Sequence, residues 1–253
     1  MGEVTAARFV DVHSHVVPSG DDGAASLEEG LELCRLARDA GTRVLFATPH
    51  WHAPWDSYPW TEERGRMFDA AFPLLRETVA EWGLDLRRGW ELYPSEIPEH
   101  GVEELVLEGT EAVLVEFPGW WVELDGAVEL TLAGCERVAA AGLLPVLAHP
   151  ERCRAIAQDP GAVTPFVERG WPLCVNAASL TREHGERAHA AGWRLLDDGL
   201  VALVASDGHR SARPPRLDEA YALVERRYGA AAARPLFEGA AVPWLATPVG
   251  TRG

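Results

Sequence analysis

Short apolar runs alternate with longer amphipathic stretches along most of the chain. Seven runs rich in leucine and β-branched residues are predicted strands, at residues 8–13, 43–48, 84–92, 112–117, 143–148, 172–175 and 200–205. Stretches with helical spacing are predicted at residues 26–41, 61–82, 99–107, 127–141, 160–169, 183–198, 216–228 and 230–238. Strands that alternate with helices are typical of βα units around a parallel sheet or barrel. The pattern therefore predicts an α/β fold, and seven strands rather than eight predict a distorted TIM-like barrel.

Two of these helices carry further local signals. Ser26 and Glu29 form a capping-box pattern at the start of the first helix, and Gly41 closes it. Its apolar face is predicted to include Leu27, Leu31, Cys34 and Leu36. In the second helix we expect a bend near Pro73, because proline has no amide donor.

Composition adds limits to this picture. The 253 residues, 47% hydrophobic and 25% charged, suit a single globular domain spanning 1–253. Residues 1–10 lack the pattern of a signal peptide, and no window is apolar enough for a membrane span. We therefore expect a cytoplasmic protein with no membrane insertion. A net charge of −16 argues against nucleic acid and anionic membranes as partners.

The basic and sulfur-containing residues exclude several reaction classes. All 23 basic residues are arginine, so Schiff-base catalysis and a phosphate-binding P-loop, which need lysine, are excluded. No C-x-x-C pair, typical of zinc ribbons and redox motifs, occurs among Cys34, Cys135, Cys153 and Cys174. None of these is followed by arginine at the spacing that cysteine-dependent phosphatases use. Reduced thiols are the simplest interpretation.

Side chains that can bind metal lie at the ends of the predicted strands. Six of the seven runs carry histidine, aspartate or glutamate at the carboxyl end, where functional groups gather in β/α barrels. These residues are His13, His15, His50, Glu91, Glu116, His149, Asp207 and His209. A lone histidine there is usually structural, but a whole set at one face predicts a metal centre. The other histidines, His52, His100, His184 and His189, are interpreted as surface or structural residues.

Spacing within this set predicts more than one ion. In an extended segment residues i and i+2 point to the same face, so His13 and His15 converge, as do Asp207 and His209. Imidazole and carboxylate together suit zinc, manganese or iron. With Asp22 included, the ligands exceed the roughly three to five that one such ion takes, which implies two or three ions. Two neighbouring ions can activate water for phosphoester cleavage.

Two arginines follow these ligands closely. Arg152 ends the sequence His-Pro-Glu-Arg that begins at His149, and Arg213 lies shortly after His209. A guanidinium group offers a planar, bidentate fork for phosphate oxygens. Both are therefore candidates for binding a phosphoryl group, and a surface ion pair is the alternative.

The motifs form an ordered series along the chain. They are Asp11-Val-His13-Ser-His15, Asp21-Asp22-Gly23, Ala47-Thr-Pro-His50, Glu91, Val115-Glu116-Phe117, Ala148-His149-Pro-Glu-Arg152 and Ala205-Ser-Asp207-Gly-His209. This series resembles the polymerase-and-histidinol-phosphatase (PHP) superfamily, and within it the bacterial capsule-locus protein-tyrosine phosphatases. The resemblance extends from Phe9 to Phe237, and its specificity lies in the order and spacing of the whole set.

The resemblance implies a distorted (β/α)7 barrel with a three-ion site. The first ion would be held by His13, His15, Glu91 and Asp207. The second would be held by Glu91, Glu116 and His149, with Glu91 as the bridge. The third would be held by Asp22, His50 and His209. The resemblance also implies that Arg152 and Arg213 bind the phosphoryl group, and that manganese is the metal, with zinc or iron as alternatives.

Two aromatic segments depart from the family pattern. Residues 51–60 and 117–121 are rich in tryptophan and proline, and Tyr93-Pro94 follows Glu91. Packing of long loops against the barrel is the favoured interpretation for most of them, and stacking on a phosphotyrosine ring is the alternative. Both segments border the predicted site. Their departure from the family pattern therefore leaves the identity of the substrate undetermined, but it does not change the predicted reaction.

The leading hypothesis is a metal-dependent phosphomonoesterase that acts on protein phosphotyrosine, by in-line attack of a metal-bridging hydroxide on phosphorus. The resemblance adds a bacterial tyrosine-kinase tail, in an exopolysaccharide regulatory system, as a partner. One alternative is a small-molecule phosphatase, such as one for histidinol phosphate. The other is a non-catalytic, metal-binding regulatory module. An exonuclease fits poorly with the acidic charge.

Overall fold

The computed structural model describes residues 8–51, 58–119 and 126–244, and its strands pair in parallel. The strands are β1 (Phe9–Asp11), β2 (Thr42–Ala47), β3 (Asp85–Arg88), β4 (Glu91–Leu92), β5 (Ala112–Glu116), β6 (Leu144–Ala148), β7 (Leu173–Asn176) and β8 (Val201–Ala205). One sheet has the order β1-β2-β3 and the other β4-β5-β6-β7-β8. This sequential, parallel order confirms the predicted α/β class.

Isolated bridges join the two sheets beyond the strand ends. Ser14 bridges to Gly208, which connects the segment after β1 to the segment after β8. His50 bridges to Glu91, which connects the segment after β2 to β4. In support of the second bridge, the Glu91 amide donates to the Pro49 carbonyl at 3.1 Å. The strands therefore close into a distorted barrel at their carboxyl ends, where the predicted ligands lie.

The run at residues 84–92 differs from its prediction as one strand. It forms β3, which pairs with β2, and β4, which pairs with β5, with Gly89 and Trp90 between them. At Gly89 the backbone lies so close to Leu107 that an added Cβ would stand 2.6 Å from Leu107 Cδ2. A glycine inside a strand pattern often marks such a close approach. The prediction of one continuous strand was wrong, because the chain pairs with β2 before Gly89 and Trp90 and with β5 after them.

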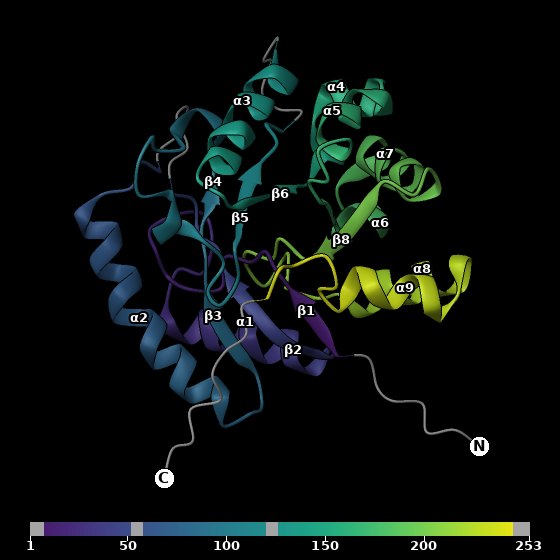
Figure 1. The fold of residues 1–253 in the computed structure, drawn as a ribbon. Helices are drawn as coiled ribbons and strands as arrows, with labels where there is room; N and C mark the ends of the chain where they lie inside the picture. Colours follow the sequence, from purple (N-terminus) through teal and green to yellow (C-terminus); the bar gives the residue numbers. More distant parts are fainter. Residues whose placement is uncertain (1–7, 52–57, 120–125, 245–253) are drawn as a thin grey trace.

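Helices surround the strands (Figure 1). They are α1 (Leu27–Asp39), α2 (Glu62–Ala80), α3 (Ala127–Ala140), α4 (Arg154–Gln158), α5 (Thr164–Val167), α6 (Ala177–Leu180), α7 (Gly185–Asp197), α8 (Asp218–Tyr228) and α9 (Ala230–Phe237). Short 3₁₀ helices are η1 (Pro94–Glu96), η2 (Val102–Leu105), η3 (Pro150–Arg152) and η4 (Pro160–Val163). In Figure 1, α2 (blue) and the α8–α9 pair (yellow) lie on opposite sides of the strands. Within the described ranges, no helix has the length and apolarity needed to cross a membrane.

Two predicted helices needed correction, and two short helices were not predicted. The predicted helix at 99–107 is only the 3₁₀ helix η2, and the one at 160–169 is divided into η4 and α5. Prolines stand at the first positions of η4 and at the second position of α5, and each lacks the amide needed to continue a preceding helix. Helices α4 and α6 were not predicted, because five and four residues are too few to show helical periodicity.

Helix α1 buries a different face from the one predicted. Its buried residues are Gly30, Leu33, Cys34 and Ala37, whereas Leu27 is 37% exposed and Leu31 and Leu36 are partly buried. Of the predicted face, only Cys34 is fully in the core. The physical reason is Gly30, where an added Cβ would stand 2.5 Å from the Val16 carbonyl oxygen. The helix approaches the neighbouring backbone along this side.

The predicted start of α1 is confirmed. The Ser26 hydroxyl accepts a hydrogen bond from the Glu29 amide at 3.2 Å, and the Glu29 carboxylate accepts one from the Ala25 amide at 2.8 Å. These bonds satisfy amides that the first helical turn leaves free. Pro73 lies inside α2, which continues past it to Ala80.

The barrel interior is filled by an apolar cluster of its own. Its buried members are Val12, Phe46, Leu107, Ala112, Leu114, Val146, Ala148, Cys174, Leu203, Ala205 and Val242. A larger cluster packs the outer strand faces against the helices. Since side chains alternate along a strand, Glu116 shares the interior face of Ala112 and Leu114 in β5. By the same rule Asn176 shares the interior face of Cys174 in β7.

Candidate metal centre

The nine predicted ligands meet above this interior cluster. Glu91 begins β4, Glu116 ends β5, and the others lie just beyond strand ends or, for Asp22, before α1. Their ligand atoms form four overlapping groups, each with atoms within 4.8 Å of one another. The groups are His15–Asp22–His50–His209, His13–His15–Asp207, His13–Glu91–His149 and His50–Glu91–Glu116. The fold thus brings together every residue that the strand-end pattern selected.

His13 and His15 converge, as their spacing predicts. Their Nε2 atoms are 3.3 Å apart, and both side chains are fully buried. Asp207 Oδ1 lies 3.3 Å from His13 Nε2 and 3.7 Å from His15 Nε2. Two imidazole nitrogens and a carboxylate oxygen therefore point toward the same small volume, as the ligands of one ion do.

Glu91 lies at the middle of the cluster. Its Oε2 is 3.2 Å from His13 Nε2, 3.3 Å from His15 Nε2 and 3.1 Å from His50 Nδ1. Its Oε1 is 2.8 Å from His149 Nε2. Burial opposes ionisation, but the charges of His13 and His50 and the hydrogen bonds hold the pKa of Glu91 well below its usual range. An ionised carboxylate with partners on both oxygens can bridge two cations.

A third group lies closer to solvent. Asp22 Oδ1 is 3.6 Å from His50 Nε2 and 3.2 Å from His209 Nε2. The His209 ring stacks on the His15 ring with centroids 3.8 Å apart. The Asp22 side chain is 45% exposed, whereas those of His13 and His15 are inaccessible. This group therefore forms the outer edge of the centre.

Glu116 is a buried carboxyl group that lies near other carboxylates of the centre. Burial, together with the charges of Glu91 and Asp207, raises the pKa of Glu116 well above its usual range. Its ligand atom lies with those of His50 and Glu91, while His149 groups with His13 and Glu91. The grouping differs in this respect from the expected second set of Glu91, Glu116 and His149. Glu91 is common to both groups, as a bridging ligand would be.

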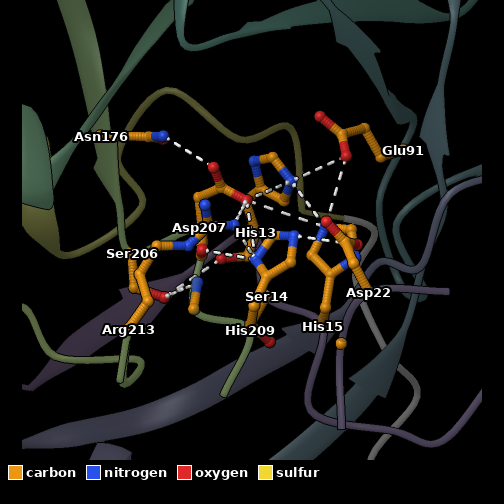
Figure 2. A network of polar contacts seen from close by, with 12 residues as sticks. His13, Ser14, His15, Asp22, Glu91, Asn176, Ser206, Asp207, His209 and Arg213 are labelled. Carbon is orange, nitrogen blue, oxygen red and sulfur yellow. Dashed lines mark hydrogen bonds and ion pairs between the residues drawn. The ribbon is translucent and has the colours of Figure 1, made fainter. Parts of the chain in front are cut away.

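Both predicted arginines reach the centre through Asp207. Arg152 Nη1 donates to Asp207 Oδ2 at 2.7 Å, and Arg213 Nη2 lies 3.6 Å from Oδ1 and contacts the His209 ring. Figure 2 shows Arg213 and Asp207 on the same side of the cluster. The side chains are 11% and 28% exposed, respectively. Guanidinium donors thus stand beside the ligands and remain partly accessible to solvent.

The donor set fits divalent cations. Three buried carboxylates, of Glu91, Glu116 and Asp207, lie among imidazoles in a region of low solvent access. Such a concentration of negative charge is costly unless cations or protons offset it. Imidazole nitrogen with carboxylate oxygen is the ligand mixture of zinc, manganese and iron sites. The residues present therefore fit such ions chemically.

Asp21, to which no role was assigned from the sequence, contacts two of the predicted ligands. Its Oδ2 lies 3.0 Å from His15 Nδ1 and accepts a hydrogen bond from the His50 amide at 3.2 Å. Burial opposes ionisation of Asp21, but the hydrogen bond and charge of His15 hold its pKa below its usual range. A carboxylate on the second nitrogen of a metal-binding imidazole fixes the ring and its tautomer. Its position beside Asp22 was the available signal.

Asn176 is the second residue that the strand-end search missed. It ends β7, the strand without a predicted ligand, and its Nδ2 donates to Asp207 Oδ2 at 2.8 Å (Figure 2). The backbone amide of Asn176 donates to Glu151 Oε1 at 3.1 Å. Burial raises the pKa of Glu151 to about 7. The signal for Asn176 was its place on the interior face, two residues after Cys174.

The remaining histidines and tryptophans agree with structural roles where they are described. His184 Nδ1 lies 3.1 Å from Ser179 Oγ, and His189 Nδ1 lies 3.1 Å from the Ser179 carbonyl. Trp60 packs on Trp51 and Trp90, with ring centroids 5.2 and 4.5 Å apart. This supports packing as the role of these rings. His52 and residues 120–121 lie outside the described ranges.

Comparison with known proteins places the chain in a family. Residues 9–245 match the family model described as "Capsular polysaccharide synthesis, CpsB/CapC". Tyrosine-protein phosphatase YwqE of Bacillus subtilis (strain 168) is 29% identical over 226 residues, which cover 87% of this chain and 85% of the relative. Tyrosine-protein phosphatase CpsB of Streptococcus pneumoniae is 28% identical over 240 residues, which cover 90% and 95%.

A solved structure agrees with this assignment. It is described as YwqE from Bacillus subtilis and CpsB from Streptococcus pneumoniae, metal-dependent tyrosine phosphatases. It matches with a TM-score of 0.73 and 28% identity over 90% of each chain. The resemblance read from the ordered motifs is therefore confirmed, and the chain belongs to the CpsB/CapC family of capsular polysaccharide synthesis, whose relatives include metal-dependent tyrosine phosphatases.

Proposed function

We propose that the protein hydrolyses phosphotyrosine in protein substrates at the metal centre around Glu91. The observation that carries this proposal is the convergence of nine ligands and two arginines at the mouth of the barrel. The names of the relatives YwqE and CpsB, both tyrosine-protein phosphatases, support the substrate class. When bound, the ions supply Lewis acidity and lower the pKa of coordinated water, which is the nucleophile this chemistry needs.

We further propose that the centre takes two or three ions, with manganese as the native metal and zinc or iron as alternatives. Each of Glu91, His13, His15 and His50 belongs to two of the four ligand groups. Among them Glu91 offers two carboxylate oxygens, with which it would bridge neighbouring ions. Only imidazole and carboxylate occur in these groups, and no thiolate. The carboxylates suit manganese, and the imidazoles suit zinc and iron, which are kept as the alternatives.

Arg152 and Arg213 bind the phosphoryl group in this proposal. Each donates to or lies near an oxygen of Asp207, so their guanidinium groups are already oriented toward the ligands. Phosphate oxygens next to the ions would meet these donors, and bidentate contacts would neutralise charge that develops during transfer. The leaving tyrosinate is a stabilised phenolate, so proton donation to it is not a prerequisite.

The substrate is proposed to be the tyrosine-phosphorylated tail of a bacterial kinase that regulates exopolysaccharide synthesis, in the cytoplasm. The description of the matched family as capsular polysaccharide synthesis supports the link to exopolysaccharide synthesis. The four cysteines are buried and unpaired, which suits a reducing compartment. A small-molecule phosphatase and a non-catalytic metal-binding module are the alternatives to this function.

A substrate panel tests the proposal. The purified protein, loaded in turn with manganese, zinc and iron, is assayed on a phosphotyrosine peptide, a phosphoserine peptide and histidinol phosphate, alongside metal analysis. We expect preferential turnover of the phosphotyrosine peptide. Faster turnover of histidinol phosphate would favour the small-molecule alternative, and metal binding without any phosphate release would favour the regulatory one.

Two arginine variants test the phosphoryl contact in the same assay. Arg213→Met should lower kcat/KM by roughly 100- to 1,000-fold, as does loss of one donor to a developing charge. Arg216→Met is the matched control, because Arg216 is 44% exposed and pairs with Asp218 at 2.6 Å. Equal activity of the two variants would refute a role for Arg213 in binding phosphate.

A further inference from the structure

Arg64, in the first turn of α2, is a buried arginine that the metal centre does not contain. Its relative exposure is 6%. Four main-chain carbonyl oxygens accept hydrogen bonds from its guanidinium group. They are those of Ser19 (from Nε, 2.8 Å), Tyr58 and Pro59 (from Nη1, 2.6 and 3.3 Å) and His50 (from Nη2, 3.0 Å). The buried positive charge is thus stabilised by carbonyl dipoles from separate segments of the chain.

These carbonyls belong to two of the three loops that supply the outer ligand group. Ser19 lies two residues before Asp21 and three before Asp22, in the segment between β1 and α1. His50 is itself a ligand, in the segment between β2 and α2. A second tie between these loops is the hydrogen bond from the His50 amide to Asp21 at 3.2 Å. Arg64 therefore contacts the backbone of both loops at once.

The loop before Asp21 is shaped to accept the Arg64 stem. Gly20 has a φ of +75°, and an added Cβ there would stand 3.3 Å from Arg64 Cγ. Glycine reaches this left-handed conformation without strain. The head of Arg64 lies 5.1 Å from the centroid of the Trp60 ring and 6.0 Å from that of Tyr58. The Tyr58 ring in turn lies parallel to the His50 ring at 6.1 Å.

We propose that Arg64 is a positioning residue for the outer ion, holding the loops so that Asp22 and His50 can share a cation with His15 and His209. This inference rests on the metal-dependent function proposed above. A planar guanidinium with several fixed donors can hold two loops at once, whereas a lysine ammonium cannot reproduce that fork. Groups that support metal ligands in this way change metal affinity by about 10- to 100-fold when removed.

The test measures metal binding in the full-length protein. Metal-stripped wild type, Arg64→Lys and Arg64→Met are titrated calorimetrically with Mn²⁺, and near-ultraviolet circular dichroism reports that each is folded. We expect the weakest-bound Mn²⁺ to lose about 10- to 100-fold in affinity in both variants. The Mn²⁺ concentration for half-maximal activity should rise by the same factor, with kcat recovered by Arg64→Lys at high Mn²⁺.

Arg66→Met is the matched control on the same helix. Arg66 is 71% exposed and pairs with Glu62 at 3.3 Å, so its loss should leave Mn²⁺ affinity at the wild-type value. Wild-type Mn²⁺ affinity in folded Arg64→Lys would overturn the proposal. If Arg64→Met fails to fold, the Mn²⁺ affinity of Arg64→Lys alone decides the test. A wild type that binds Mn²⁺ but releases no phosphate would refute the proposed function alone. A loss of Mn²⁺ affinity in the Arg64 variants would still support the positioning role of Arg64.

Discussion

At the scale of single residues, Asp207 connects the ligands to their surroundings. One oxygen faces His13, and the other accepts hydrogen bonds from Arg152 and Asn176. Its φ of +52° lies in the left-handed region, as does that of His149 at +39°. Few residues other than glycine adopt this region, although aspartate does so more readily than most. Backbone strain at two candidate ligands is typical of sites where geometry serves function.

His184, beside Ser179, offers a prediction about pH and stability. Burial and the charge of Arg152 lower the pKa of His184 from 6.5 to about 3. Between these values the unfolded chain binds a proton that the folded protein does not. The free energy of unfolding should therefore fall as pH decreases below 6.5, by up to about 1.4 kcal/mol per pH unit, until the folded group also titrates near pH 3.

Urea unfolding in the presence of a chelator at about pH 7 and about pH 5 checks this prediction. From the same linkage, His184→Gln should remove up to about 2 kcal/mol of the loss in stability between the two conditions. His100→Gln, a substitution of an exposed histidine, should retain the wild-type difference. An unchanged pH dependence in His184→Gln would show that this imidazole does not control acid stability.

At the scale of secondary-structure elements, glycines decide how closely helices approach the barrel. Gly30 in α1 faces the Val16 carbonyl oxygen, which an added Cβ would approach to 2.5 Å. Gly65 in α2 has room for a methyl group, since an added Cβ would lie 3.6 Å from the Trp60 ring, an ordinary van der Waals contact. The same substitution in the first turns of two helices should therefore have opposite effects.

We expect Gly30→Ala to destabilise the protein and Gly65→Ala to stabilise it. Alanine gains up to about 1 kcal/mol over glycine inside a helix, and Gly65→Ala should show part of that gain. At Gly30 the clash with backbone should outweigh it, with a net loss of about 1–3 kcal/mol. Chemical denaturation of both variants gives the sign directly. Stabilisation by Gly30→Ala would mean that α1 can move away from the first loop at little cost.

At the scale of the whole molecule, the candidate metal centre joins segments from both ends of the chain. His13 follows β1 and His209 follows β8, and the outer core likewise includes Phe9 and Phe237. We therefore propose that the chain is one domain that unfolds in a single transition. The ions should contribute to its stability, because the folded state assembles ligands that the unfolded chain keeps far apart.

Metal removal should lower the midpoint of thermal unfolding. At a free Mn²⁺ concentration about 100 times the dissociation constant, one site contributes about 2.7 kcal/mol. In a protein of this size each kcal/mol corresponds to about 2–4 °C, so we expect a shift of roughly 5–10 °C. Scanning calorimetry with Mn²⁺ and with chelator measures it. Glu91→Gln should lose most of the shift, and a wild-type midpoint insensitive to chelator would contradict a structural contribution of the ions.

Local patterns account for what the sequence determined by itself. The period of apolar residues set the order of strands and helices, and the i, i+2 spacing of His13 and His15 set their convergence. The ends of parallel strands meet at one face, so Glu116, His149 and Asp207 could be placed together without coordinates. Missing lysine and missing cysteine motifs excluded other chemistries. All of these depend only on residues near one another in the chain or on a rule shared by the whole fold class.

Tertiary structure decided which distant groups meet. Three contacts join segments that are remote in the sequence. One is the hydrogen bond between Asn176 and Asp207, and another is the set of hydrogen bonds from Arg64 to the Ser19 and His50 carbonyls. The third is the close approach of Gly89 to Leu107. The buried face of α1 and the division of ligands into groups are of the same kind. No local pattern encodes them, because each depends on how closely two backbones approach, and a few tenths of an ångström change the outcome.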